Sequence, residues 1–204
     1  LSELRNKVGR LANALIRSGV KPLDRVACIG SNSIDTFVIF LAVVSIGAMF
    51  TCCSPELGSQ SILDRFVQTE PKVLFADDWT VYNGKRTSCM GKVVAVAKEL
   101  RAKAKLERLI LVPRFAFAHP NVPDGGQYLS DFVAGAGKEL CFTQTAFSHP
   151  MVIVYSSGTT GPPKCIVHTV GGVLMKQKKE QILCLDMDID SVYLQYSSVG
   201  SLRS

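Results

Sequence analysis

The sequence has 204 residues, of which 47% are hydrophobic and 20% are charged, and its formal net charge is +6. This composition is typical of a globular protein of one domain or two small lobes and excludes a disordered chain. The basic residues are scattered and form no stripe interleaved with aromatic residues, so the sequence does not support nucleic-acid binding.

The cysteines and the apolar runs narrow the class of protein further. The seven cysteines form no C-x-x-C pair and lie mostly in apolar runs, which predicts reduced thiols in a cytosolic protein, with Cys52 and Cys53 packed in the core. The three histidines lack the spacing of a zinc site, and we expect no metal-binding residues. The longest apolar run, 37–50, is too short for a membrane span, and no signal peptide is visible. Because the first residue is Leu1, we expect the chain to start inside a longer protein.

Helical and strand-like segments alternate through the first part of the chain. Apolar residues recur at helical spacing over 4–15, and the next helix starts from a cap at Asn32 or Ser33 and ends near Gly47. A further helix is expected at 61–69, and short apolar strands are expected at 25–30, 48–52 and 72–75. This order predicts an α/β fold, with a mainly parallel sheet covered by helices.

The second part of the chain has longer irregular stretches. We expect mostly loop over 77–91 and an exposed connector over 114–126. The remaining expected elements are helices at 92–103 and 172–186, at most a short helix at 129–133, and strands at 109–112, 151–154, 165–169 and 192–196.

Residues 155–164, Tyr-Ser-Ser-Gly-Thr-Thr-Gly-Pro-Pro-Lys, join two strand-like runs. Glycines let a backbone approach an anion closely and turn its N–H groups toward it. Lys164 supplies a positive charge. Hydroxyl donors come from Ser156, Ser157, Thr159 and Thr160. The stretch therefore predicts a loop that binds a polyphosphate.

Two other interpretations of this stretch are a polar surface loop and a Walker A loop. The surface loop is disfavoured by the flanking strands, the two prolines and the closing lysine. A Walker A loop needs glycine directly before its lysine, then serine or threonine and a helix. Here Pro163 precedes Lys164, Cys165 follows it, and the next segment is strand-like, so Walker A is excluded.

The same stretch resembles the phosphate-binding signature Ser/Thr-Ser-Gly-Thr-Thr-Gly-x-Pro-Lys of the adenylate-forming enzymes, which include acyl-CoA synthetases, luciferases and peptide-synthetase adenylation domains. The resemblance implies that 1–204 is part of a large N-terminal adenylation domain with a strand–loop–strand phosphate loop. It places the catalytic lysine in a small C-terminal domain outside this chain, and so implies no catalytic residue here. The residues implied to bind the ATP phosphates are Ser156, Ser157, Gly158, Thr159, Thr160, Gly161 and Lys164.

Shorter motifs resemble the acyl-CoA synthetases that activate acetoacetate. They are Leu57-Gly58, 63–66, 81–85, 147–150, 163–168, Gly171-Gly172 and 196–200. This resemblance implies an acid–thiol ligase with acetoacetate, ATP and CoA as small-molecule substrates and Mg²⁺ with the ATP; no protein partner is inferred. The resemblance stops at Ser201 to Ser204, which departs from the family pattern. We expect 1–204 alone to be inactive, because the family's adenine- and ribose-binding motifs and its C-terminal domain are not in this sequence. Another short-chain acyl-CoA synthetase and a non-catalytic truncated product remain alternatives.

A second site is implied at the stretch Tyr82-Asn83-Gly84-Lys85, which in related enzymes carries basic residues near the CoA nucleotide. Lys85 keeps the charge, and Tyr82 is available to stack on adenine; a surface turn with one solvated lysine is the alternative. His168 has no nucleophile paired to it in the sequence, so we interpret it as a structural or pocket-wall residue. Asp77-Asp78 is interpreted as a strand-to-loop turn rather than a metal site.

Overall fold

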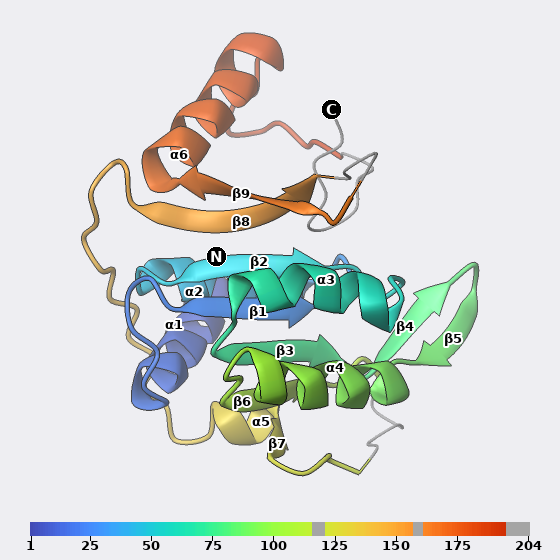
Figure 1. Ribbon diagram of the computed structural model, residues 1–204. Helices are drawn as coiled ribbons and strands as arrows, with labels where there is room; N and C mark the ends of the chain where they lie inside the picture. The colour runs from blue at the N-terminus through green and yellow to red at the C-terminus, as the bar shows by residue number, and fades with distance from the viewer. Residues whose placement is uncertain (116–120, 157–160, 195–204) are drawn as a thin grey trace.

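The computed structural model describes residues 1–115, 121–156 and 161–194. A seven-stranded sheet with the order β7-β6-β3-β1-β2-β8-β9 forms its centre (Figure 1). Its pairings are parallel except for the antiparallel β8–β9 pair, so the expected α/β class with a mainly parallel sheet is confirmed. The strands are β1 (Arg25–Ile29), β2 (Met49–Cys53), β3 (Val73–Asp77), β6 (Arg108–Val112), β7 (Gly126–Tyr128), β8 (Pro150–Ser156) and β9 (Lys164–Thr169).

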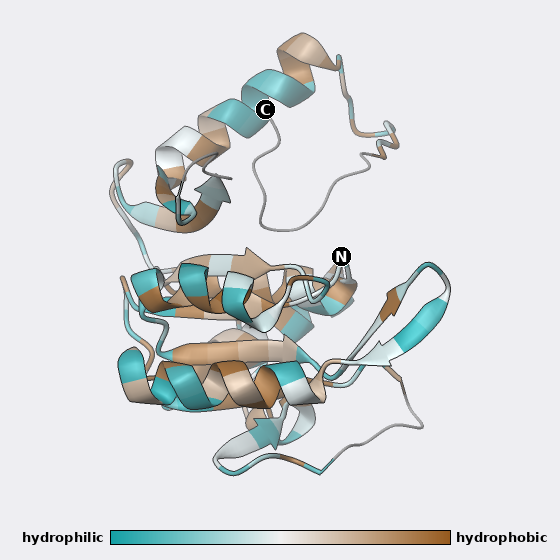
Figure 2. Ribbon diagram, turned by 45° about the vertical axis from the view of Figure 1, so that its right-hand side comes forward, coloured by the Kyte–Doolittle hydropathy of each residue, from teal (hydrophilic) through white to brown (hydrophobic). Residues whose placement is uncertain are grey.

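Helices cover both faces of the sheet and make two hydrophobic cores. One core contains buried residues of α1 (Ser2–Arg17), α2 (Ile34–Ser45) and α5 (Leu129–Phe132), and the other contains residues of α3 (Ser59–Thr69) and α4 (Met90–Lys103). Along β1, Cys28 packs in the first core and its neighbour Ala27 in the second, because successive side chains of a strand point to opposite faces. Figure 2 shows hydrophilic residues on the outer surfaces of the covering helices.

The segment 77–91, expected to be mostly loop, instead contains a hairpin of β4 (Trp79–Tyr82) and β5 (Lys85–Ser88), followed by the start of α4. Its turn residues, Asn83 and Gly84, have φ angles of 49° and 73°. Two positive φ angles in succession suit the tight hairpin turn that Asn-Gly favours. The expectation that 77–91 is mostly loop is therefore wrong. The exposed connector expected over 114–126 is wrong at Gly126, where the short strand β7 begins.

The C-terminal part of the described chain lies beside β8 and β9. Thr169 caps α6 (Val170–Lys179) by accepting a hydrogen bond from the amide of Gly172 at 3.2 Å. The helix continues as a π-helical turn, η1 (Glu180–Cys184), so the helix expected at 172–186 is present but starts two residues earlier. The strand expected at 192–196 is wrong for 192–194, which form no regular structure, and 195 and 196 lie outside the described residues.

Cysteine packing follows the expectation. Cys52 and Cys53 are each 2% exposed, and all seven cysteines are free thiols. Among the described residues, no helix is both long enough and apolar enough to cross a lipid bilayer.

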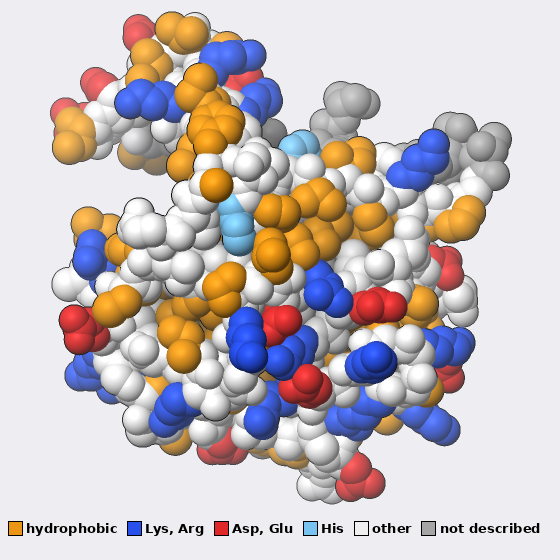
Figure 3. Space-filling view, turned by 60° about the vertical axis from the view of Figure 1, so that its left-hand side comes forward, with side chains coloured by type: hydrophobic (Ala, Val, Ile, Leu, Met, Phe, Trp, Pro, Cys, Tyr) orange, Lys and Arg blue, Asp and Glu red, His pale blue; other side chains and the backbone are white. Residues whose placement is uncertain are grey.

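Apolar side chains also gather on the surface between α6 and the sheet below it, as Figure 3 shows. A hollow of about 490 Å³ on the α1 and α2 side of the sheet is lined by residues that include Leu4, Phe142 and Leu174. Leu174 and Met175 of α6 are 60% and 65% exposed. Apolar surface is therefore exposed around α6.

Candidate functional site

The two arms of the stretch that the sequence predicts to bind phosphate are the strands β8 and β9. Ser156 and Lys164 are cross-strand partners at the end of this antiparallel pair where 157–163 connects the two strands, and Tyr155 pairs with Cys165 one step before them. Because paired residues share a face of the sheet, Ser156 and Lys164 are on one face, opposite to Tyr155 and Cys165. The arrangement brings the first hydroxyl and the closing lysine of the signature together.

The remaining signature residues are only partly described. Gly161 is exposed, and a Cβ atom added there would meet no atom within 4 Å, so its surroundings are open. Ser157, Gly158, Thr159 and Thr160 lie outside the described residues.

Tyr155 anchors the β8 arm to the rest of the domain. Its hydroxyl, on a residue only 3% exposed, accepts a hydrogen bond from the Thr51 hydroxyl of β2 at 2.7 Å. The Arg65 guanidinium of α3 lies 5.6 Å from the centroid of the Tyr155 ring. Burial raises the pKa of Tyr155 far above its ordinary value, so the phenol stays protonated. Tyr155 therefore joins β8 to both β2 and α3.

Gln68, in the last turn of α3, anchors the other arm. Its Nε2 donates to the carbonyl oxygen of Pro163 at 3.0 Å, and its Oε1 accepts from the thiol of Cys165 at 3.6 Å. Sequence reasoning missed this role, because in the sequence Gln68 looks like any polar residue on a helix surface.

The second candidate site lies at the tip of the β4–β5 hairpin. Tyr82 and Lys85 are cross-strand partners there, so their side chains share a face, and Tyr82 is 57% exposed. Next to Lys85, the Arg86 guanidinium lies 4.7 Å from the centroid of the Phe115 ring. The hairpin thus brings together the aromatic ring and the positive charge that the sequence suggested.

Asp77 and Asp78 close the carboxyl end of β3 and are almost fully buried. An Asp77 oxygen accepts from the amide and the hydroxyl of Ser31, at 2.9 and 2.5 Å, and lies 3.7 Å from Arg114 Nε. Asp78 accepts from the amide of Arg114 at 2.9 Å. These bonds join the loops that follow β1, β3 and β6, which supports the structural interpretation. Among the described residues, no group of three or more His, Cys, Asp or Glu side chains could hold a metal ion.

Two other sequence features have simple structural roles. His168 is a half-buried residue of β9 that pairs with Val152, as expected of a structural or wall residue. Asp64 and Arg65, which look like a charge pair in the sequence, bond separately: Asp64 accepts from Gln60 at 2.7 Å, and Arg65 donates to the carbonyl of Ser61 at 2.6 Å.

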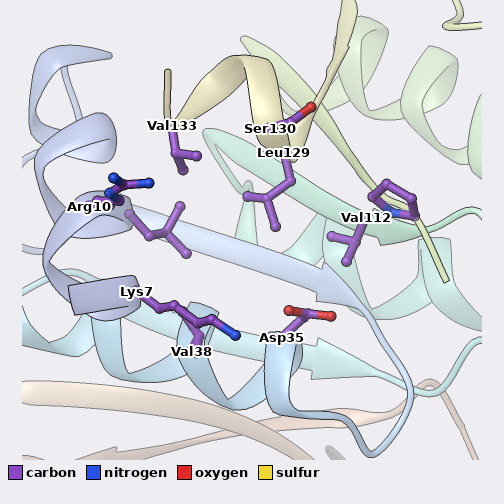
Figure 4. A pocket seen from close by; sticks show the side chains of 10 residues that line it. Lys7, Arg10, Asp35, Val38, Val112, Leu129, Ser130 and Val133 are labelled. Carbon is purple, nitrogen blue, oxygen red and sulfur yellow. The ribbon is translucent and has the colours of Figure 1, made fainter. Parts of the chain in front are cut away.

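A second hollow, of about 310 Å³, lies between α1, α2 and α5 (Figure 4). Lys7, Arg10 and Asp35 carry charges at its walls, and aliphatic residues such as Val38 and Val133 line it. None of the residues that the sequence singled out as phosphate- or CoA-binding lines this hollow.

Known proteins are similar in sequence to this chain over most of its length. The chain is 44% identical over 182 residues to the acetoacetyl-coenzyme A synthetase of Rhizobium meliloti (strain 1021), covering 87% of this chain and 27% of that protein. It is 35% identical over 193 residues to the malonamoyl-CoA synthetase vrtB of Penicillium aethiopicum, covering 91% of this chain and 26% of that protein.

The same similarity holds in three dimensions. The structure of the acetoacetyl-CoA synthetase from Streptomyces lividans superposes with a TM-score of 0.89 at 36% identity, covering 97% of this chain and 30% of that one. The chain thus spans less than a third of the length of each of these relatives. The family model described as AMP-binding enzyme matches residues 1–200. The chain therefore belongs to the AMP-binding enzyme family.

Proposed function

We propose that the protein containing this chain is an acid–thiol ligase that activates acetoacetate with ATP and transfers the acyl group to CoA. The observation that carries the proposal is the β8–β9 pair, which holds Ser156 and Lys164 side by side at the ends of a phosphate-binding signature. The similarity to two acetoacetyl-CoA synthetases supports the choice of acid. In this proposal 1–204 is part of the large N-terminal adenylation domain.

The proposed reaction solves a leaving-group problem. A carboxylate is a poor acyl donor because its leaving group would be oxide. An oxygen of the acetoacetate carboxylate attacks the α-phosphorus of ATP, the bond from that phosphorus to the bridging oxygen breaks, and pyrophosphate leaves. The CoA thiol then loses its proton and attacks the acyl carbon of the acyl-adenylate, and AMP leaves as acetoacetyl-CoA forms.

The chain's own contribution to this reaction is to bind and orient the β and γ phosphates. Lys164 would pair with the γ-phosphate, and the hydroxyls of Ser156, Ser157, Thr159 and Thr160 would donate to phosphate oxygens. Gly158 and Gly161 would allow close approach of the backbone. Each charge-assisted hydrogen bond of this kind contributes about 1.5–3 kcal/mol.

The other proposed ligands depend less on this chain. Mg²⁺ would accompany ATP and offset phosphate charge. Because the described residues gather no group of three metal-ligating side chains, we assign no protein ligand to the ion. Lys85 and Tyr82 would contact the CoA nucleotide.

The free cysteines support a reducing, cytosolic location.

Another short-chain acid remains the second candidate substrate. The similarity to a malonamoyl-CoA synthetase supports it. That relative is 35% identical to this chain, and its name refers to a different acid. A panel of acetoacetate, malonamate and acetate in ATP–pyrophosphate exchange separates the candidates. Exchange with acetoacetate at the highest kcat/KM is the expected result.

The test of the phosphate site is Lys164→Ala in the whole protein. Loss of one charge-assisted contact is expected to raise the KM for ATP or lower the adenylation rate, by about tenfold to a hundredfold in kcat/KM. Lys98→Ala is the matched control, since Lys98 is an exposed lysine of α4 outside the site. An unchanged kcat/KM for ATP in Lys164→Ala would show that Lys164 is not a phosphate ligand.

A further inference from the structure

Lys164 lies at the end of the β8–β9 strand pairing, where its backbone has strand contacts on one side only. It is the first residue of β9, and its partner Ser156 is the last residue of β8, so together they form the final pair of the ladder. Within the described sheet, β9 is an edge strand that pairs with β8 alone. The ends of a hairpin open more readily than its middle. The strand pairing by itself therefore holds the backbone of Lys164 less firmly than the middle of β9.

Gln68 contacts the chain on both sides of Lys164. Its Nε2 donates to the carbonyl of Pro163 at 3.0 Å, and the thiol of Cys165 donates to its Oε1 at 3.6 Å. A side-chain amide has two N–H donors, and the second reaches the carbonyl of Asp64 one helical turn back. The amide thus links helix α3 to the residues before and after Lys164.

The protonation state of Cys165 suits this contact. Burial raises the pKa of Cys165 above its ordinary value, so the thiol keeps its proton at neutral pH and acts as the donor. Cys165 packs against the core that contains Ile62 and Phe66 of α3. Because alternate residues of a strand face opposite sides, fixing Cys165 toward α3 turns Lys164 to the other face, which it shares with Ser156.

The helix that carries Gln68 is firmly held. Ile62 and Phe66 of α3 are fully buried, and Thr69, next to Gln68, is 6% exposed. The Gln68 amide is therefore presented from a packed element rather than from another loop. Placement matters here, since a displacement of about 1 Å in a group that contacts the reacting phosphates costs up to about a hundredfold in rate.

We infer that Gln68 is a positioning residue, which fixes the backbone of Lys164 so that the lysine reaches the ATP phosphates. The inference rests on the proposed function, and it assigns to Gln68 an effect that operates through Lys164 alone. In this inference Gln68 itself contacts neither ATP nor the acid.

The experiment measures ATP affinity in the whole protein by isothermal titration calorimetry, with Gln68→Leu as the test variant. Loss of the bonds to Pro163 and Cys165 is expected to weaken ATP binding by about fivefold to tenfold. Gln60→Leu is the matched control: it removes a glutamine from the same helix whose amide donates to Asp64 within that helix. Both variants are expected to unfold at the same temperature, and Gln60→Leu to change the ATP Kd by less than about twofold.

A double-mutant cycle with Lys164→Ala separates positioning from a general structural role. If Gln68 acts through Lys164, adding Gln68→Leu to Lys164→Ala changes the ATP Kd by less than about twofold. Equal losses from Gln68→Leu in both backgrounds, or equal Kd values for Gln68→Leu and Gln60→Leu, would overturn the inference. ATP binding without formation of an acyl-adenylate would refute the proposed function while the cycle still decides the role of Gln68. A wild-type protein that binds no ATP would refute both.

Discussion

At the scale of single residues, the carboxyl end of β3 shows how burial changes a charge. Asp77 is 1% exposed, and burial raises its pKa above the ordinary value of 3.8, despite the opposing effects of Ser31 and Arg114. A carboxyl group whose pKa is higher in the folded state than in the unfolded state binds its proton more tightly when folded. The free energy of unfolding that it contributes is therefore greatest at low pH.

The expected result is a loss of stability as pH rises from about the ordinary carboxyl pKa of 3.8 through the raised pKa of Asp77, with a plateau above it. In Asp77→Asn this contribution is absent, because the amide does not titrate. Denaturant unfolding of both proteins across this range gives the difference between their unfolding free energies. Wild type should lose stability relative to Asp77→Asn as pH rises, and a constant difference would contradict the assignment.

Lys85 lies at the tip of an exposed hairpin, where a change of charge has little structural cost. If it contacts the CoA nucleotide, Lys85→Glu replaces attraction with repulsion and raises the KM for CoA by about tenfold, with the KM for ATP unchanged. Steady-state kinetics with each substrate varied in turn checks this. An equal rise in both KM values would remove the CoA assignment and leave the surface turn.

At the scale of elements, helix α1 is held against the chain that leads to β8. A Cβ atom at Gly9 would lie only 2.2 Å from the carbonyl oxygen of Lys138. On the same side of α1, Asn13 donates to the carbonyl of Glu139 at 2.7 Å. The absence of a side chain at Gly9 therefore lets this segment pack directly on the helix backbone.

The contrast between two helical glycines tests this packing. Alanine normally stabilises a helix relative to glycine by up to about 1 kcal/mol, and a methyl group added at Gly91 of α4 would meet only open space, so Gly91→Ala should be neutral or stabilising. Gly9→Ala should instead lower stability by about 1–3 kcal/mol, because the methyl group collides with backbone. Thermal unfolding of the two variants gives the comparison, and similar shifts would argue against close packing at Gly9.

At the scale of the whole molecule, the fold divides into a doubly covered sheet and a less covered end. The central strands β1 and β3 lie between the two cores. Strand β8 adds Ile153 and Tyr155 to one of them and pairs with β2 at Phe50 and Thr51. Beyond β8, the edge strand β9 and helix α6 expose much of their surface. Stability is therefore expected to fall from the centre of the sheet toward α6.

Amide hydrogen exchange of the 204-residue chain measures this gradient. The amides of β1 and β3 should exchange slowest, those of β8 at an intermediate rate, and those of β9 and α6 fastest, because local opening needs less free energy where less apolar surface is buried. Uniform protection from β1 through α6 would contradict the division.

Much of the local structure around the candidate site could be predicted from neighbouring residues in the sequence. The strand–loop–strand arrangement, the helix cap at Ser33 and the core positions of Cys52 and Cys53 follow from periodicity and from residue chemistry within a few positions. The hairpin at 79–88 had a local signal in Asn83-Gly84, but its polar, exposed second strand lacks the apolar alternation that marks a strand.

The sequence by itself determined the alternation of strands and helices, the prediction of a polyphosphate-binding loop and the family that its signature resembles, because each depends on residues close together in the chain. Only the tertiary structure decided the strand order, the bonds of Asp77 to Ser31 and the contact of Gln68 with Pro163, which is 95 positions away. Local periodicity fixes which face of an element is buried, whereas the choice of partner depends on how the whole chain packs.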